Sequence, residues 1–173
     1  MIFDEFRDRK ANGYRLGEYR RVLYDEEIQN AIWPFLEKKM PYKVLDEKRS
    51  QDFKHAWNKQ FVKKKKASGP RLGQLRIFNT EEGRKKGYRY LWEGLKQKRC
   101  LQGEEALNCL DMQEREQCFV HFPVIDLTIL IKKADLLDLE NIHDMTDVVL
   151  ADEKMTWTFV KTHEKGLGPY FVA

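Results

Sequence analysis

The residues best suited to chemistry are a neighbouring histidine and glutamate near the carboxyl end, His163 and Glu164. A histidine beside a carboxylate can act as a general base or ligate a metal ion. If both residues lie on a strand, however, their side chains point to opposite faces and cannot act directly on one ligand. We therefore expect them to hydrogen-bond to the following turn and to hold Tyr170 in place. A catalytic role for His163 and Glu164 is the minority hypothesis.

Three aspartates, Asp126, Asp147 and Asp152, fall at the ends of predicted strands. Together with Glu164 they could hold a divalent metal through oxygen ligands, with Lys161 nearby, as nucleases and phosphoesterases do. Acidic residues at strand ends are more often turn formers. We therefore predict neither a metal ion nor another cofactor, and these aspartates are minority candidates.

A basic segment, residues 59–99, is the strongest candidate for binding. Residues 41–100 hold eighteen Lys and Arg against six Asp and Glu, a net charge of +12. Basic side chains contact phosphates, and exposed aromatic rings can stack on bases. The alternative is a solvated basic surface over buried aromatic rings, because the segment has no RNP pattern, zinc spacing or G-x-x-G clamp. The candidate binding residues are Lys63, Lys64, Lys65, Lys66, Arg84, Lys85, Lys86, Arg89 and Trp92.

The charge is distributed unevenly along the chain. Residues 1–40 carry eight basic and eight acidic side chains, whereas residues 101–173 carry six against fourteen, a net −8. Opposed charged surfaces of this kind steer association with other proteins. The basic middle would meet an acidic partner, and the acidic last third would meet a basic one.

Several classes of protein are disfavoured by what the sequence lacks. The longest apolar runs, such as 127–131, are far shorter than the roughly 18 residues of a membrane span, and the charged start at 1–8 does not resemble a signal peptide. The three cysteines stand nine residues apart with no C-x-x-C, which argues against disulfides and zinc. Phosphate-loop, dinucleotide-binding and hydrolase-elbow motifs are also missing. We expect a single cytoplasmic domain over residues 1–173.

Helices are predicted mainly in the first part of the chain. Residues 1–40 should form a helical N-terminal extension, with acidic residues 25–27 at a helix start and Pro34 kinking or ending that helix. The clearest helix runs from about 46 to 62, with an apolar stripe of Phe53, Ala56, Trp57 and Phe61. Its outer side should carry Lys54, His55, Asn58 and Lys59. A short helix is expected at 103–110, whereas 80–99 is ambiguous because three glycines interrupt its helical stripe.

Strands are predicted mainly in the second half. Residues 118–122 and 126–131 read as two short strands around Pro123, either a hairpin or a sheet edge. Residues 147–152 and 156–162 read as a second strand pair, with a short helical turn at 134–142 between the two pairs. A further strand is expected at 74–78. The tail then turns at Gly168-Pro169 and folds Tyr170 and Phe171 back onto the sheet. The order of elements predicts an α+β fold, with N-terminal helices packed on a mostly antiparallel sheet.

These patterns, followed by D-V-V-L-A-D, W-T-F-V-K-T-H-E and G-P-Y-F, resemble a family of small bacterial domains of unknown function common in bacilli. The likeness covers about residues 40–172 and is strongest from Asp147 to Phe171. The family has a Trp-His step in its middle segment, where this chain has Leu91-Trp92-Glu93. An activity that depended on that histidine would therefore be absent here. The resemblance implies a fold and a bacterial source, but no activity.

The sequence as a whole favours a binding protein over an enzyme. We expect a small macromolecule-binding protein, of the immunity or inhibitor type, that neutralises a toxin or defence enzyme by covering its active site. The alternative is a nucleic-acid-binding or nuclease-like protein that uses the basic segment 59–99. A protein partner is the expected one, a nucleic acid is the second, and no membrane association is expected.

Overall fold

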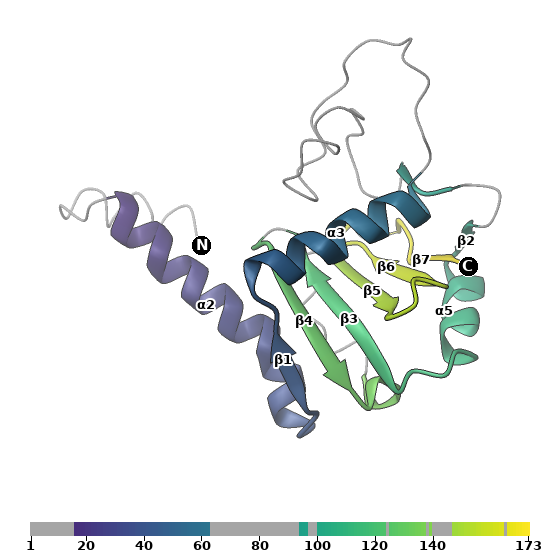
Figure 1. Ribbon diagram of the computed structural model, residues 1–173, viewed down its shortest axis with the longest axis horizontal. Coiled ribbons are helices and arrows are strands. Elements are labelled where there is room, and N and C mark those ends of the chain that lie inside the picture. The colour runs from purple at the N-terminus through teal and green to yellow at the C-terminus, as the bar shows by residue number, and fades with distance from the viewer. Residues whose placement is uncertain are drawn as a thin grey trace, which may run out of the picture.

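The computed structural model describes residues 16–62, 94–96, 100–123, 125–137, 139, 147–164 and 166–173. These residues form α-helices against a seven-stranded antiparallel sheet, with helices mostly early in the chain and strands mostly late (Figure 1). The predicted α+β class is therefore confirmed. No described helix is long and apolar enough to span a membrane.

The sheet has the order β1-β4-β3-β5-β6-β7-β2, and every neighbouring pair is antiparallel. Both predicted strand pairs are present, because β3 pairs with β4 and β5 pairs with β6. The C-terminal segment is also folded back as expected, and β7 lies between β6 and β2. The strands are β1 Tyr42–Val44, β2 Cys100–Gln102, β3 Gln117–Phe122, β4 Leu127–Lys132, β5 Val148–Asp152, β6 Thr158–Lys161 and β7 Tyr170–Val172.

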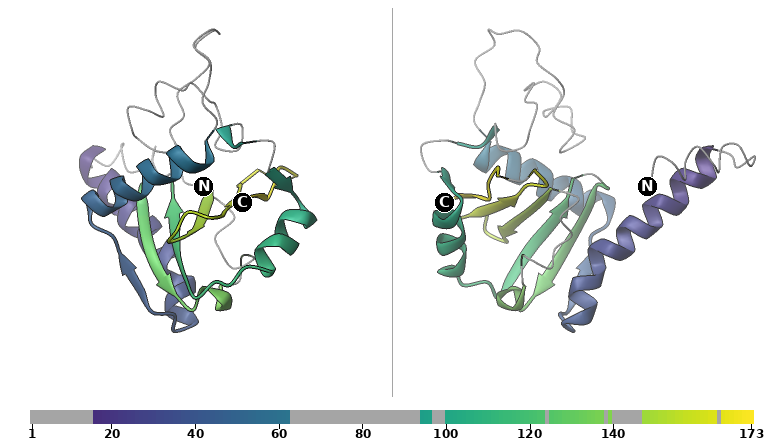
Figure 2. Two further views of the ribbon diagram at one scale, coloured as in Figure 1. Left: turned by 45° about the vertical axis from the view of Figure 1, so that its right-hand side comes forward. Right: turned by 180° about the vertical axis from the view of Figure 1, so that it is seen from behind.

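Helices cover both faces of this sheet (Figure 2). Helix α3, Glu47–Phe61, lies on one face, whereas α2, Leu16–Glu37, and α5, Glu104–Asp111, pack on the other at opposite ends of the sheet. A short 3₁₀ helix, η3 at Ala134–Leu136, follows β4. The larger core cluster lies on the α2 and α5 face, and the smaller cluster lies under α3.

Helix α2 differs from the sequence prediction at both ends. It begins at Leu16, so the acidic residues 25–27 lie inside it and not at its start. It also continues three residues past Pro34, so of the two expected effects of this proline, kinking or ending the helix, the ending is wrong. The last turn is held by packing, since Phe35 is fully buried and its ring lies 6.4 Å from that of Tyr42. The N-terminal half of α2 projects beyond the sheet (Figures 1 and 2).

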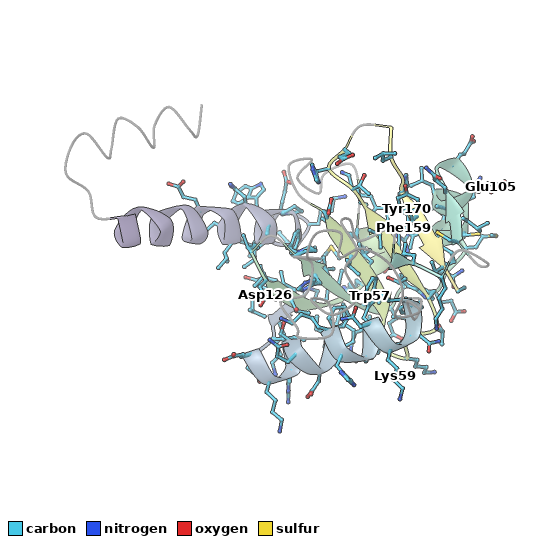
Figure 3. All side chains as sticks on the ribbon, turned by 90° about the horizontal axis from the view of Figure 1, so that it is seen from above. Trp57, Lys59, Glu105, Asp126, Phe159 and Tyr170 are labelled. Carbon is cyan, nitrogen blue, oxygen red and sulfur yellow. The ribbon has the colours of Figure 1, made fainter. Side chains whose placement is uncertain are left out.

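Helix α3 forms as its apolar stripe predicts. Asp46 caps its N-terminus, accepting a hydrogen bond from the backbone N–H of Arg49 at 2.9 Å, which satisfies one of the otherwise unpaired N–H groups of the first turn. Trp57 points from the helix toward the sheet, and Lys59 points into solvent (Figure 3).

The outer side of α3 was predicted wrongly at two positions, Lys54 and Asn58. Both are buried, with Lys54 only 1% exposed, whereas His55 and Lys59 are exposed as predicted. The error arises because the face that α3 buries is wider than its apolar stripe. It includes Lys54, which pairs with Asp126 in the β3–β4 turn, and Asn58, whose buried amide nitrogen has no hydrogen-bond partner among the described residues.

Four segments whose secondary structure the sequence analysis considered fall wholly or partly outside the described residues. They are the first residues of the N-terminal extension, the strand at 74–78, the ambiguous stretch 80–99 and the helical turn at 134–142. Within that turn the described part is helical at Ala134–Leu136. Within the ambiguous stretch, Leu95 forms an isolated antiparallel bridge with Val62 at the end of α3.

Candidate functional site

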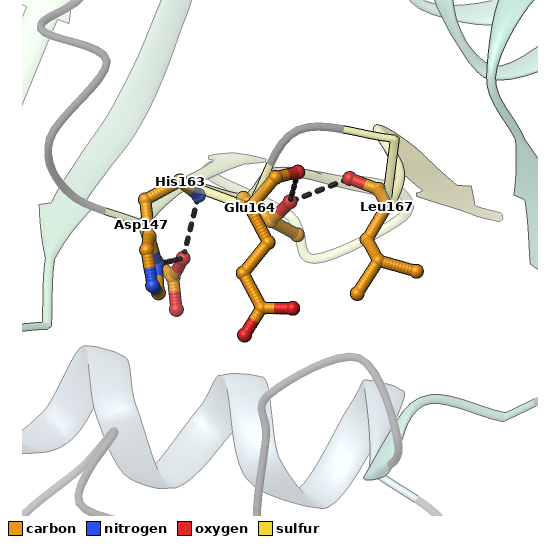
Figure 4. Close-up of polar contacts among 5 residues, drawn as sticks. Asp147, His163, Glu164 and Leu167 are labelled. Carbon is orange, nitrogen blue, oxygen red and sulfur yellow. Dashed lines mark hydrogen bonds and ion pairs between the residues drawn. The ribbon is translucent and has the colours of Figure 1, made fainter.

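The histidine singled out in the sequence forms a pair with one of the singled-out aspartates. Asp147 Oδ1 lies 2.7 Å from Nδ1 of His163 and also accepts the backbone N–H of His163 at 3.0 Å (Figure 4). Asp147 directly precedes β5, and His163 follows β6 by two residues. The two residues meet because Val148 pairs with Lys161 in the hairpin.

This arrangement corrects the expectation that His163 bonds to the following turn. That turn is instead held by Thr162, whose Oγ1 donates to the carbonyl oxygen of Leu167 at 2.5 Å and lies 3.3 Å from that of Glu164. Because β6 ends at Lys161, the alternation of side chains along a strand does not apply to His163 and Glu164. Figure 4 shows both side chains pointing to the same side of the loop.

The contact between Asp147 and Nδ1 of His163 determines which ring nitrogen is left for chemistry. A carboxylate on Nδ1 orients an imidazole and leaves Nε2 to exchange a proton or ligate a metal. The His163 side chain is 45% exposed and that of Asp147 is 13% exposed, so the imidazole is reachable from solvent. Within the described part of the chain, no hydroxyl or thiol is hydrogen-bonded to His163. A nucleophile activated by this base is therefore not assembled among those residues.

The tyrosine expected next to this tail is packed in the sheet. Tyr170 is 9% exposed. Burial raises the pKa of its hydroxyl, and the Cys100 thiol and Glu164 carboxylate nearby raise that pKa further. The phenol of Tyr170 therefore stays protonated at neutral pH.

The other candidate metal ligands are separated. Asp126 lies in the β3–β4 turn, at the same end of the strands as Asp147, whereas Asp152 ends β5 at the opposite end. Asp152 caps the next turn, where it accepts the N–H groups of Thr156 at 2.7 Å and Trp157 at 3.0 Å. Across the described ranges, no three His, Cys, Asp or Glu side chains lie close enough to hold a metal ion together.

Asp126 has a partner that the sequence did not reveal. Its Oδ1 lies 2.6 Å from Nζ of Lys54, whose side chain is 1% exposed while that of Asp126 is 45% exposed. Beside this ion pair, Ser50 Oγ lies 2.6 Å from Thr128 Oγ1, and Thr128 Oγ1 lies 2.9 Å from Nδ1 of the buried His121. Polar groups are thus matched across the interface of α3 with β3 and β4.

The same polar layer continues toward the centre of the sheet. The indole N–H of Trp57 donates to Thr158 Oγ1 at 2.7 Å, and Thr158 Oγ1 donates to the carbonyl oxygen of Leu150 at 2.7 Å. The signal for this layer was present in the sequence. Ser50, Lys54 and Asn58 recur at intervals of four on α3, which places them on one line beside the apolar stripe.

The predicted basic binding residues cannot be placed on the fold. Lys63, Lys64, Lys65, Lys66, Arg84, Lys85, Lys86, Arg89 and Trp92 all lie outside the described residues. The structure therefore leaves the nucleic-acid hypothesis as a prediction.

The described surface carries a concentration of exposed apolar side chains at one edge of the sheet. Trp33 and Leu36 on α2, with Tyr42 and Val44 on β1, are 61%, 50%, 38% and 44% exposed. We call these four residues the edge patch. Tyr42 and Val44 pair with Ile131 and Ile129, which lie in the core cluster on the α2 face, so the two side chains point to that face.

The rotation of α2 places its share of the edge patch on the exposed side of the helix. Trp33 and the fully buried Phe35 are about 200° apart around α2, so Trp33 points away from the core. Leu36 lies about one turn from Trp33 and is also exposed. Just after the helix, Nζ of Lys38 donates to the carbonyl oxygen of Leu136 at 3.4 Å, so the end of α2 lies beside η3.

The fold and these sites define a small α+β domain with an exposed apolar edge and a polar layer under one helix. Over residues 32–171 the sequence matches the family described as domain of unknown function DUF4275. The chain belongs to this family, as the resemblance over residues 40–172 indicated. No curated protein and no solved structure matches the chain.

Proposed function

We propose that the protein acts by binding another protein, as an inhibitor or immunity protein does when it covers the working surface of a toxin or defence enzyme. The observation that carries this proposal is the edge patch. A tryptophan is usually well buried, yet Trp33 is 61% exposed, with Leu36 on the same side of α2. Exposed apolar patches of this kind mark interaction sites, and Trp and Tyr are the side chains most often found at binding hot spots.

The charge distribution supports the same function. The net charge of +12 over residues 41–100 and −8 over residues 101–173 would accelerate encounter with a charged partner and orient it. The described part of the acidic region includes α5, where Glu104, Glu105 and Asp111 are exposed. Asp147 and His163 then serve as a structural clasp between β5 and the loop after β6.

The test begins with isolation of the stoichiometric protein partner from the native host, followed by binding measurements on the two purified proteins. Trp33→Ala should weaken binding by at least about tenfold, because hot-spot truncations commonly have this effect. Met112→Ala is the matched control, since Met112 is 74% exposed directly after α5, at the far end of the sheet. It should leave the affinity unchanged.

Inhibition is tested by titrating the partner's own activity with the protein. An inhibitor or immunity protein should abolish that activity at one equivalent, and Trp33→Ala should require a higher concentration. The competing function is nucleic-acid binding by the basic segment 59–99. Affinity for single-stranded RNA or DNA that falls steeply with salt, with no protein partner recovered, would overturn the proposal in favour of that function.

A further inference from the structure

Within the described residues, the outward backbone groups of β1 have no partner strand. Leu45 N donates to Thr128 O at 2.9 Å, and Lys132 N donates to Pro41 O at 2.8 Å. In an antiparallel ladder, residues alternate between facing the partner strand and facing away. Pro41, Lys43 and Leu45 therefore direct their backbone groups to β4. The N–H and C=O of Tyr42 and Val44 point outward, where β1 ends the sheet order.

The outward N–H and C=O groups of Tyr42 and Val44 can pair with another strand. Natural sheets shield such edges, because unpaired N–H and C=O groups readily pair with a second chain. Here all three residues of β1 are exposed, and Tyr42 and Val44 carry apolar side chains on the α2 face. An added strand would satisfy four backbone groups and place two of its own side chains against these apolar residues.

We propose that β1 binds an extended segment of the partner protein as an additional antiparallel strand, and that this segment has the pattern apolar–acidic–apolar. This inference rests on the proposed function and names how the same surface binds. The apolar residues lie opposite Tyr42 and Val44, on the α2 face. The acidic residue lies opposite Lys43, on the α3 face.

The acidic residue follows from the geometry of the new ladder. Tyr42 and Val44 form hydrogen-bonded pairs with the added strand, so Lys43 lies in the non-hydrogen-bonded pair between them. Side chains approach most closely in such pairs, and opposite charges there are stabilising.

The same geometry disfavours a second copy of this chain as the occupant. Two β1 strands related by a twofold axis would pair Tyr42 of one with Val44 of the other in both directions. Lys43 would then face its own copy at the closest side-chain approach, and like charges directly opposite each other are destabilising.

The test uses a capped synthetic peptide with the central sequence Ile-Glu-Ile and the nitrogen-15-labelled protein. The peptide should shift the backbone amide signals of Tyr42 and Val44 and slow their hydrogen exchange. Two matched peptides, one with Lys in place of Glu and one N-methylated at both Ile residues, should each bind at least about tenfold more weakly. The N-methylated peptide keeps every side chain, so it isolates the backbone pairing without altering the protein.

A variant of the protein supplies the complementary test. Val44→Pro removes an outward N–H, leaves the Lys43–Leu130 pairing intact, and is compatible with an edge strand. It should lose peptide and partner binding, whereas Val44→Thr, which keeps the N–H, should retain both. No saturable shift of the Tyr42 and Val44 amides up to about 1 mM peptide, or unchanged peptide binding by Val44→Pro, overturns the proposal.

The outcomes also separate this inference from the proposed function. If Trp33→Ala loses the purified partner while Val44→Pro keeps it, strand addition is wrong and protein binding stands. If both variants keep the partner, the edge patch is not the binding surface. Concentration-dependent dimerisation that the peptide reverses would identify a second copy as the occupant and refute the acidic strand.

Discussion

Replacing Asp126 should cost the protein far more stability than replacing its partner Lys54. The side chain of Lys54 is 1% exposed and that of Asp126 is 45% exposed, with 2.6 Å between Nζ and Oδ1. Removing one member of a buried ion pair leaves an uncompensated charge and costs about 3–5 kcal/mol. Because the carboxylate is partly hydrated, we expect about 3 kcal/mol for Asp126→Gly. Lys54→Met removes the buried cation, leaves a solvated carboxylate, and should change stability by about 1 kcal/mol or less.

The choice of glycine controls for the backbone. Asp126 has a φ of 50°, a conformation that glycine adopts without strain, whereas alanine would add a separate penalty. Asp126→Asn also tolerates this conformation and keeps an oxygen for Lys54, so it should cost about half as much as Asp126→Gly. Lys54→Met should rescue most of the loss in a Lys54→Met/Asp126→Gly double variant.

The assay is urea unfolding at neutral pH, in which the four variants are compared with one common dependence of the unfolding free energy on urea concentration. The coupling energy between Lys54 and Asp126 is taken from the double-mutant cycle. The reasoning is refuted if Lys54→Met destabilises the protein as much as Asp126→Gly does. It is also refuted if Asp126→Gly costs less than about 0.5 kcal/mol, since the buried ammonium would then not depend on Asp126.

Three further predictions concern the core and the C-terminal turn. Gly168→Ala should cost about 2 kcal/mol or more in thermal unfolding, because its φ is 79° and an added Cβ would lie 3.0 Å from the Tyr170 ring. Gly166→Ala, with φ 85° and open space around it, should cost only about 1 kcal/mol. Equal losses for the two variants would contradict this prediction. Burial raises the pKa of Cys118 from 9.0 to about 12, so the folded state keeps a proton that the unfolded state loses. Stability should therefore fall as pH rises from about 9 toward 12, and a thiol reagent at pH 8 should modify Cys118 only after unfolding. Thr158→Val should cost about 2 kcal/mol in urea unfolding, because it removes the acceptor of the Trp57 indole N–H, whereas Thr158→Ser keeps the hydroxyl and should cost less.

The parts of the fold that the sequence predicted are those with local causes. The hairpins β3–β4 and β5–β6 each join two alternating strands through a short turn, so pattern and turn residues suffice. Helix α3 likewise follows from its apolar stripe and its cap at Asp46. The positions of β1 and β2 at the two edges were not predictable in this way. Each pairs with a strand far along the chain, and no local pattern encodes that choice.

The candidate site likewise has one feature that the sequence could have predicted and another that it could not. Asp147 and His163 were selected separately as an acid and a base, but their pairing was missed. It follows from the β5–β6 register, in which Val148 lies opposite Lys161, and a register assigned to the predicted hairpin would have revealed it. The line of Ser50, Lys54 and Asn58 on α3 signals the burial of Lys54, but no local pattern reveals its partner Asp126, which lies 72 residues further along the chain in the β3–β4 turn.

The strand order also determines how the sheet should open and close. Its centre is made of strands that follow one another along the chain, whereas β1 is held by β4 through pairs such as Tyr42 with Ile131. Non-local pairings carry the larger entropy cost of loop closure, so the outermost strand is expected to form late during folding and to exchange its amide hydrogens early in the native state. The strand that we propose as the docking edge is thus also among the least protected. A partner strand on its outer side would hold β1 from both directions, so that recognition and local ordering become one event.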